Sequence, residues 1–239
     1  MYTIPISADI HTHSVASGHG SRDTITDMAR AAAKNSLKIF GISDHAPATP
    51  GSAGVSYFRN LRLADRERFG VKLFYGVELN ILNADGDVDL EDELTQSLDY
   101  AFISMHHPIF QSGDISSNTS AYINAMKHPG VRFLGHPDDG RFPVDYERLL
   151  SACRKYQVFP EINNASLMPD AYRADGYCNS LKILSLCKKM QLPVLLSSDS
   201  HGKEHIGDMQ YIFPLLEECD FPEKLIINSN MELLQRILG

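Results

Sequence analysis

The chain has 239 residues, 43% of them hydrophobic, and no long biased tract, which suits one globular domain over residues 1–239 of the size of an α/β barrel. With 22 Lys and Arg against 30 Asp and Glu, the formal net charge is −8, which argues against a surface that binds nucleic acid by releasing counterions. The first residues lack a basic region followed by an apolar stretch, and no uncharged apolar run is long enough to cross a bilayer. We therefore expect a soluble, cytoplasmic protein with no membrane partner and no stable nucleic-acid binding. The oligomeric state is left open.

Short β-rich runs alternate with helical patterns along the chain, which is typical of a parallel sheet with crossover helices. Seven strands are expected, in order, at 4–10, 38–42, 71–77, 100–104, 131–134, 158–162 and 194–197. A short further strand is expected at 224–227. This alternation indicates a parallel βα barrel.

Helical patterns fill the intervals between these strands. Thr24 and Asp27 have the spacing of a capping box, with Asp in place of Glu, and open a first helix with one apolar stripe. One later helix is expected to have its cap at Asn118 or Thr119, and two more are expected over 144–156 and 209–218. A last helix is expected to begin at Ser229, with Glu232 three residues on.

The four cysteines form no C-x-x-C pair, and most lie within apolar helical patterns: Cys153, Cys178, Cys187 and Cys219. This favours small buried side chains over disulfides or thiolate ligands. A zinc site built from thiolates is therefore not expected.

Residues of the types that bind metal ions gather where the strands end. His11 and His13 are one residue apart on an extended segment, so they point to the same side and could reach one ion. Six further residues of this kind each follow a later strand: His45, Glu78, His106, His136, Asp199 and His201. In a parallel βα barrel the carboxyl ends of the strands converge on one mouth. We expect one site there, with His19 in the first loop leaning over it.

Each histidine taken alone is more often a hydrogen-bonded surface or core residue than a ligand, but coincidence explains the whole set poorly. Glu78 and Asp199 follow apolar strands directly, where a charged group is costly unless it is paired or coordinated. Asp9 and Asp44 fit two roles equally well, either as cap or turn residues or as acceptors of hydrogen bonds from ligand imidazoles. The histidines expected outside the ligand set are His107, His128 and His205.

Seven ordered segments resemble the motifs of the PHP (polymerase and histidinol phosphatase) superfamily, and in length and order those of its YcdX-type single-domain phosphatase branch. They are DIHTHS (9–14), ISDH (42–45), GVELN (76–80), SMH (104–106), GHP (135–137), EINN (161–164) and SDSH (198–201). The resemblance implies a distorted seven-stranded (β/α)7 barrel with three metal ions at the C-terminal ends of the strands.

The resemblance also implies how the ligands are shared among the three divalent ions. One ion would be held by His11, His13, Glu78 and Asp199. A second would be held by Glu78, His106 and His136, so that Glu78 bridges the two. The third would be held by His19, His45 and His201. Imidazole and carboxylate ligands suit zinc, our first expectation, and also manganese or iron.

The charge of such a site indicates its substrate. Three divalent ions carry six positive charges and two carboxylate ligands remove two, which leaves 6 − 2 = 4 for a phosphate monoester and a metal-bridging hydroxide to offset. The sequence therefore predicts a metal-dependent phosphoesterase, a hydrolase in which that hydroxide attacks a small phosphomonoester. Glu78 and Asp199 would be catalytic, and Arg141 resembles a phosphate-contacting position, although it could equally be a solvated loop arginine. His107 departs from the acidic residue that the branch tends to carry there.

Three alternatives stay open at this point. The protein could be an enzyme specific for histidinol phosphate, a 3′–5′ exonuclease-like phosphodiesterase, or a metal-binding domain without turnover. The acidic balance and the lack of an aromatic and basic groove disfavour the exonuclease.

Overall fold

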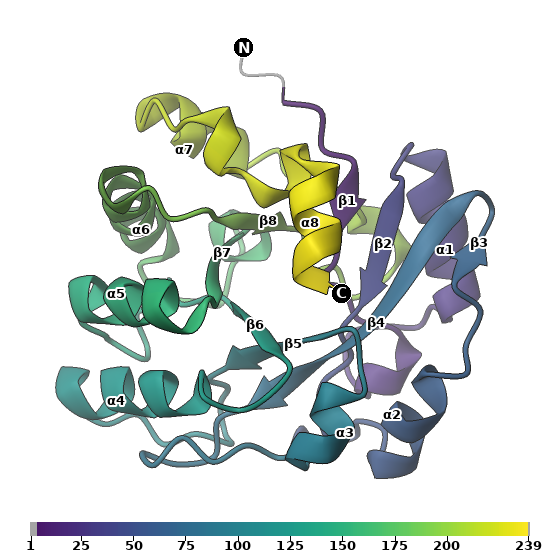
Figure 1. Ribbon diagram of the computed structural model, residues 1–239, viewed down its shortest axis with the longest axis horizontal. Coiled ribbons are helices and arrows are strands. Elements are labelled where there is room, and N and C mark those ends of the chain that lie inside the picture. Colours follow the sequence, from purple (N-terminus) through teal and green to yellow (C-terminus); the bar gives the residue numbers. More distant parts are fainter. Residues whose placement is uncertain (1–3, 239) are drawn as a thin grey trace.

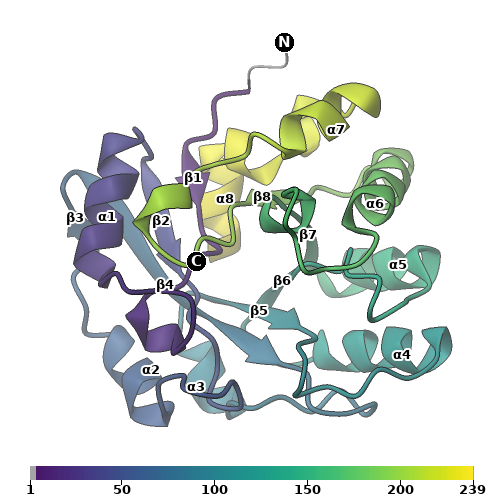
Figure 2. The ribbon, with the colours of Figure 1, turned by 180° about the vertical axis from the view of Figure 1, so that it is seen from behind.

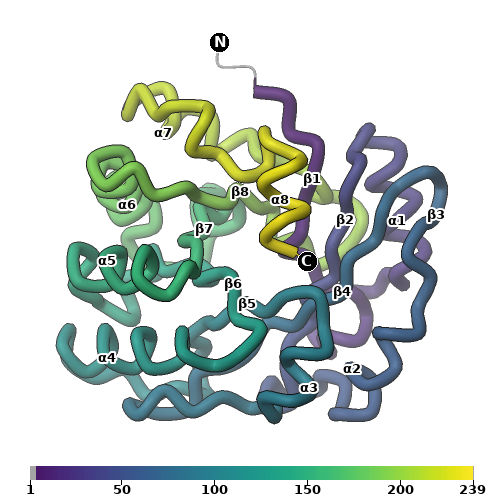
Figure 3. Tube along the Cα trace, in the orientation of Figure 1, coloured from purple at the N-terminus to yellow at the C-terminus, as the bar shows by residue number. Residues whose placement is uncertain are grey.

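The computed structural model describes residues 4–238, in which seven parallel strands form a nearly closed barrel with helices between them (Figure 1). The strands lie in the order β1 (Ala8–Asp9), β2 (Ile39–Ile42), β4 (Val71–Asn80), β5 (Tyr100–Ser104), β6 (Val131–Leu134), β7 (Phe159–Asn163) and β8 (Leu195–Ser197). A two-residue strand, β3 (Glu67–Arg68), pairs antiparallel with β4. Colour follows chain order around the barrel in Figure 3. The expected seven-stranded βα barrel is confirmed.

Eight α-helices lie within the described residues and surround the strands (Figure 1). They are α1 (Ile25–Lys34), α2 (Val55–Leu61), α3 (Asp92–Gln96), α4 (Ile115–Ala125), α5 (Tyr146–Tyr156), α6 (Gly176–Met190), α7 (Ile212–Glu218) and α8 (Met231–Leu238). Over residues 4–238, none of them is long and apolar enough to span a bilayer.

The barrel interior is filled by aromatic side chains and closed at one end by α8. Tyr100, Phe102 and Phe133 form one apolar cluster with Leu234 and Leu238 of α8. From behind, in Figure 2, α8 lies beyond the strands, so the opposite end of the barrel is nearer the viewer. A larger apolar cluster packs between the strands and the surrounding helices. The two clusters leave the end opposite α8 free for polar side chains.

A glycine in β2 makes room for one of these interior side chains. The hydroxyl of Tyr100 donates to the carbonyl of Ile10 at 2.7 Å. A Cβ on Gly41 would overlap the Tyr100 hydroxyl and lie 2.8 Å from Cβ of Ile10. Only a residue without a side chain fits there.

The gap between the first and last strands is bridged by side chains and single backbone contacts. Beyond the strand ends, Thr12 and Ser200 form an isolated parallel bridge. Nearer α8, the Asn228 side chain accepts from the backbone N–H of Leu196 at 2.8 Å and donates to the carbonyl of Ala8 at 2.9 Å. The amide of Asn228 thus satisfies backbone groups that a neighbouring strand would otherwise pair.

The prediction of a strand at 224–227 is wrong, because the Asn228 side chain takes the place of a neighbouring strand there. That segment forms two 3₁₀ turns, Glu223–Leu225 and Ile227–Ser229, with a single bridge from Ile226 to Val194. The first strand is also shorter than the expected 4–10, because only Ala8 and Asp9 pair with β2. Pro5 has no N–H to donate to a strand ladder.

Helix starts were predicted with mixed success. The capping box of Thr24 and Asp27 is confirmed at α1. The predicted caps Asn118 and Thr119 are wrong, because α4 begins four residues earlier, where Asp114 accepts from the N–H of Ser117 at 2.7 Å.

Helices α5, α7 and α8 start later than the sequence indicates. The helix expected over 144–156 begins at Tyr146, after its cap Asp145, and the one expected over 209–218 begins at Ile212. Ser229 does not open the last helix, since the side chain of Asn230 accepts from the N–H of Leu233 at 3.0 Å.

The cysteines follow the prediction in part. Cys153 and Cys187 are buried and all four thiols are free, as expected. Cys178 is exposed at the start of α6, so the expectation of burial is wrong there. A single domain over 1–239 stays a prediction, and residues 1–3 and 239 lie outside the described part of the chain.

Candidate metal centre

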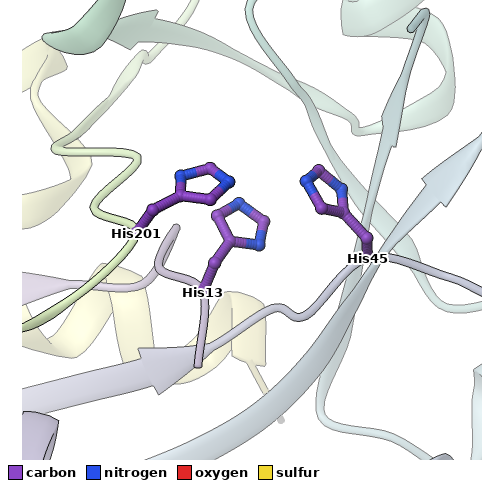
Figure 4. Close-up of side chains that lie close together, drawn as sticks. All are labelled: His13, His45 and His201. Carbon is purple, nitrogen blue, oxygen red and sulfur yellow. The ribbon is translucent and has the colours of Figure 1, made fainter. Parts of the chain in front are cut away.

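Imidazoles from separate segments point into one space at the end of the barrel opposite α8. Figure 4 shows His13, after β1, facing His201, after β8, and His45, after β2. The ring centre of His13 lies 4.3 Å from that of His45 and 4.3 Å from that of His201. One ligand atom from each of these three residues lies within 4.8 Å of the others, a spacing suited to a metal ion.

A first group of close ligand atoms surrounds one side of Glu78. Nε2 of His11 lies 3.4 Å from Oε1 of Glu78, and Nε2 of His13 lies 3.6 Å from Oε2. Oδ1 of Asp199 lies 3.1 Å from Nε2 of His13 and 3.7 Å from Nε2 of His11. These are the four residues that the sequence grouped around one ion.

A second group meets the same carboxylate at Oε1. Nε2 of His106 lies 3.2 Å from Nε2 of His136 and 3.3 Å from Oε1 of Glu78. Nε2 of His136 lies 2.9 Å from the same Oε1. Glu78 therefore contacts both groups, at the end of β4, as a bridging carboxylate would.

The remaining histidines lie together at the rim. The ring centre of His19, which is exposed, lies 4.8 Å from that of His45 and 5.1 Å from that of His201. All nine side chains that the sequence singled out as ligands are thus brought to one place.

Bonds behind the imidazoles fix which nitrogen faces the centre. Nδ1 of His11 pairs with Oε1 of Glu161 at 2.5 Å, and Nδ1 of His106 pairs with Oδ1 of Asn80 at 2.8 Å. Nδ1 of His13 contacts the Ser17 hydroxyl at 3.1 Å. In each case Nε2 is left to face the other ligand atoms, which is the usual arrangement behind a metal-bound histidine.

Several buried atoms at this centre have no hydrogen-bond partner among the described residues. They are Nε2 of His11, Nδ1 of His45, Nε2 of His201 and Oε2 of Glu78. Nδ1 of His45 lies 2.7 Å from Oε2 of Glu78 without forming a hydrogen bond. Buried polar atoms are costly without a partner, and coordination of metal ions would satisfy all four. The donor set therefore fits divalent metal ions.

The protonation of the centre suits metal binding. Burial raises the pKa of Glu78, but the histidines beside it outweigh burial and hold this pKa well below its usual value. Burial likewise raises the pKa of Asp199, but His11 and Arg173 outweigh burial and hold this pKa well below its usual value. Burial lowers the pKa of His106 to about 4. The ionised carboxylates and the neutral His106 are in the states that metal ligands require. His11 is the exception: burial lowers its pKa, but Glu161, Asp199 and Glu78 outweigh burial and raise this pKa well above its usual value, so a bound ion would displace a proton from His11.

Comparison with known proteins places the chain in a family. The model of the PHP domain matches residues 9–193. The chain belongs to the PHP domain family. The resemblance read from the ordered motifs is thereby confirmed.

Relatives of this PHP protein align over nearly its whole length. A probable phosphatase of Clostridium acetobutylicum is 36% identical over 222 residues, covering 93% of this chain and 90% of that protein. One of Caldanaerobacter subterraneus subsp. tengcongensis is 36% identical over 231 residues, covering 96% and 90%. Among solved structures, the histidinol phosphate phosphatase of Lactococcus lactis, complexed with zinc, L-histidinol and phosphate, superposes with a TM-score of 0.62 at 14% identity. That match covers 91% of this chain and 95% of the other. The structural likeness supports the barrel fold.

A cavity of about 550 Å³ opens beside the centre of this PHP protein. Besides several of the ligand-type histidines and Asp199, its walls include Thr49, Pro50, His107, Ile109, Arg141, Tyr172 and Arg173. The cavity is large enough to hold a small organic ligand against the centre.

Arg141 lines this cavity and donates hydrogen bonds to the carboxylate of Asp139. Its Nε lies 2.9 Å from Oδ1 of Asp139 and 3.0 Å from Oδ2. Asp139 is almost completely buried, whereas the Arg141 side chain is 27% exposed. Arg141 lies in a turn, and both of its expected roles, phosphate contact and solvated loop arginine, stay predictions.

Sequence reasoning assigned no role to two buried residues of the site. Glu161 on β7 is fully buried; it pairs with His11 and accepts from the N–H of His136 at 2.6 Å. Arg173 is 8% exposed and donates to Oδ2 of Asp199 at 2.7 Å. Glu161 opens the segment EINN, and the signal that could have identified it is the one that marks Glu78, a glutamate within an apolar strand. Arg173 lies in a loop, and nothing in its local sequence indicates burial.

Asp9 and Asp44, for which two roles were left open, differ in their hydrogen-bond partners. Asp9, at the end of β1, accepts from the N–H groups of Ser198 and Gly207, at 3.3 and 2.8 Å, and so ties β1 to the loop after β8, which is neither of its two expected roles. Asp44 accepts from Ser17 at 2.7 Å, and Ser17 in turn contacts His13. Asp44 thus supports a ligand imidazole through one intervening hydroxyl.

The histidines expected outside the ligand set are indeed apart from it. His128 pairs with Asp92, with Nδ1 2.6 Å from Oδ1. His205 is exposed and lies 3.8 Å from Asp208. His107 lines the cavity, so it is placed to face a substrate.

Proposed function

We propose that this protein is a metal-dependent phosphoesterase that hydrolyses small phosphomonoesters at a centre of three divalent ions. The observation that carries the proposal is the meeting of seven histidines and two carboxylates at one end of the barrel, beside a cavity that His19, His45, His106, Asp199 and His201 help to line. The names of the relatives, probable phosphatases, agree with this reaction class. The zinc in the Lactococcus lactis protein agrees with imidazole and carboxylate ligands here.

The proposed ligand sets are those that the family resemblance implies; the closest ligand atoms also join His45 to Glu78 and His106, and His13 to His45 and His201. One ion would take His11, His13, Glu78 and Asp199. A second would take Glu78, His106 and His136. The third would take His19, His45 and His201. Zinc is proposed first, with manganese or iron as alternatives.

Bound ions of this kind supply Lewis acidity and lower the pKa of water to about 7. The protein's own contribution is to hold the ligands before substrate arrives. Asn80, Ser17 and Glu161 fix imidazole orientation through Nδ1, so the ligand atoms need no rearrangement. Two ligand residues, His136 and Asp199, have positive φ angles of 27° and 53°. Such backbone strain is retained at sites where orientation matters.

The charge of the centre is the reason for proposing a phosphate ester. The three ions and two carboxylates leave an excess of 6 − 2 = 4 positive charges, which a neutral amide or sugar would not offset. We propose that Arg141, held by Asp139, contacts the phosphate at the cavity wall. Glu78 and Asp199 would act by positioning the ions against this phosphate.

Phosphate release tests the proposal. The protein, loaded separately with zinc, manganese and iron, is incubated with a broad panel of phosphomonoesters that includes histidinol phosphate, and with single-stranded DNA. We expect phosphate from several monoesters, no DNA degradation, and loss of activity in Glu78→Gln. Metal binding without any phosphate release would contradict the proposal and favour a metal-binding domain. DNA degradation that Glu78→Gln abolishes would favour the exonuclease.

A further inference from the structure

The cavity wall offers cationic and donor groups but no free carboxylate. Among its lining residues, all within 4–238, the one carboxylate is Asp199. Its Oδ2 lies 2.7 Å from Arg173, and its Oδ1 lies 3.1 Å from His13. Both oxygens are thus engaged before any substrate enters.

The other acidic side chains nearby lie behind the wall. Asp139 is 3% exposed and bound to Arg141, and Asp138 is fully buried. Neither lines the cavity. The guanidinium of Arg141 therefore faces the cavity, with the carboxylate of Asp139 on its far side.

The aromatic wall is also occupied. The guanidinium carbons of Arg141 and Arg173 lie 4.7 Å and 5.1 Å from the ring centre of Tyr172. Both distances are within the range of cation–π attraction. Tyr172 therefore already makes cation–π contacts with two guanidinium groups, which leaves little of its ring for a third cation.

His107 and Arg141 share one side of the cavity because both pack on Phe142. The ring centre of His107 lies 5.2 Å from that of Phe142, and the Arg141 guanidinium carbon lies 5.7 Å from it. Two side chains that donate hydrogen bonds to anions thus stand together at the wall, and His107 is exposed there.

Building on the phosphoesterase function above, we propose that the site prefers phosphomonoesters whose alcohol carries a second anionic group and discriminates against those carrying an ammonium group. A carboxylate or second phosphate entering beside His107 meets a hydrogen-bond donor, and it lies next to the positive charge of Arg141, which contacts the reacting phosphate. An ammonium group there loses water, finds no free carboxylate and faces a guanidinium.

Three esters that differ only in the far substituent test this preference: 3-aminopropyl phosphate, propyl phosphate and 3-(phosphonooxy)propanoate. We expect kcat/KM to rise in that order, with roughly tenfold or more between the first and the last, as avoidance of a like-charge contact implies. An ammonium substituent makes the alcohol a better leaving group, so intrinsic reactivity would favour the amine. Turnover of the amine equal to or above that of propyl phosphate would overturn the proposal, as would a carboxylate ester no better than propyl phosphate.

Binding of the matching phosphonates, in which CH₂ replaces the ester oxygen, separates this proposal from the proposed function. Calorimetry on the zinc-loaded protein should give the same order of affinity. If no ester is hydrolysed but the phosphonates bind in this order, the reaction is wrong and the preference stands. If the esters are hydrolysed and the amine binds most tightly, the reaction stands and the preference is wrong.

A substitution at the wall provides the matched control. His107→Asp adds a carboxylate at an exposed position, and His107→Asn adds a neutral group of the same size. We expect the Asp variant to raise the ratio of kcat/KM for the amine over propyl phosphate, and the Asn variant to raise it much less. Equal ratios in the two variants would show that this wall does not contact the substituent, and would overturn the proposal.

Discussion

Nδ1 of His11 lies 2.5 Å from Oε1 of Glu161, and both side chains are fully buried beneath the mouth of the barrel. The other carboxylate oxygen of Glu161 accepts from the N–H of His136 at 2.6 Å. One carboxylate on β7 thus holds a ligand residue after β1 and another after β6. It sets the distance between the two groups of atoms that meet at Glu78.

Replacing Glu161 with glutamine should weaken metal binding without removing a ligand. The variant loses the charge that orients His11, and loss of such a partner lowers metal affinity about 10–100-fold. Zinc affinity measured by competition with a chelator checks this, with Glu147→Gln on the exposed face of α5 as the control. Unchanged affinity in Glu161→Gln would show that His11 needs no such partner.

His106→Ala should remove metal and most turnover while the barrel stays folded. Nε2 of His106 lies 3.2 Å from His136 and 3.3 Å from Glu78, the two other residues of the second group. Elemental analysis of metal content, phosphate release and far-ultraviolet circular dichroism report the three properties. His128→Ala, at a histidine paired with Asp92 away from the centre, is the control. Full activity in His106→Ala would rule out the proposed second ion site.

Arg173→Met should destabilise the metal-free protein. Arg173 is buried and paired with Asp199, and removing one partner of a buried ion pair costs about 3–5 kcal/mol. The free energy of unfolding of chelator-treated protein measures this. Arg154→Met, at an exposed position on α5, should change it by less than about 0.5 kcal/mol. If the two variants lose the same small amount, the buried pair contributes no specific stability.

Asp89 should make stability depend on pH in a definite direction. Burial raises the pKa of Asp89, despite bonds from the N–H groups of Asn80 and Ala48. The folded state then holds this proton at a pH where the unfolded state has lost it. The contribution of Asp89 to the free energy of unfolding therefore falls as pH rises from its usual pKa through the raised one.

The comparison of wild type with Asp89→Asn isolates that contribution. Stability of wild type minus that of the variant should decrease across this acidic window and level off above it. Denaturant unfolding at a series of pH values provides the curve. A difference that stays constant with pH, or that increases, would mean that the pKa of Asp89 is not raised.

The sequence predicted which histidines and carboxylates meet at one end of the barrel because its signals are local. His11 and His13 alternate on one extended segment, and Glu78 directly follows apolar residues of β4. A parallel barrel brings such strand ends together without further information. This is why residues far apart in the chain could be assigned to one site.

What the sequence did not predict depends on contacts between distant segments. Arg173 is buried only because its loop folds over Asp199, and Asn228 replaces a strand only because its amide reaches Leu196 and Ala8. Neither residue type indicates such a position. The N-cap of helix α4 is Asp114. The sequence holds several competent caps in this stretch, and tertiary packing selects among them.

The central claim is that three divalent ions act together in phosphoester hydrolysis. The most direct measurement is a titration of chelator-treated protein with zinc, with phosphate release followed at each addition. We expect almost no activity without metal and a maximum reached at about three equivalents of zinc per chain. Full activity in metal-free protein, or a maximum at one equivalent, would contradict the account.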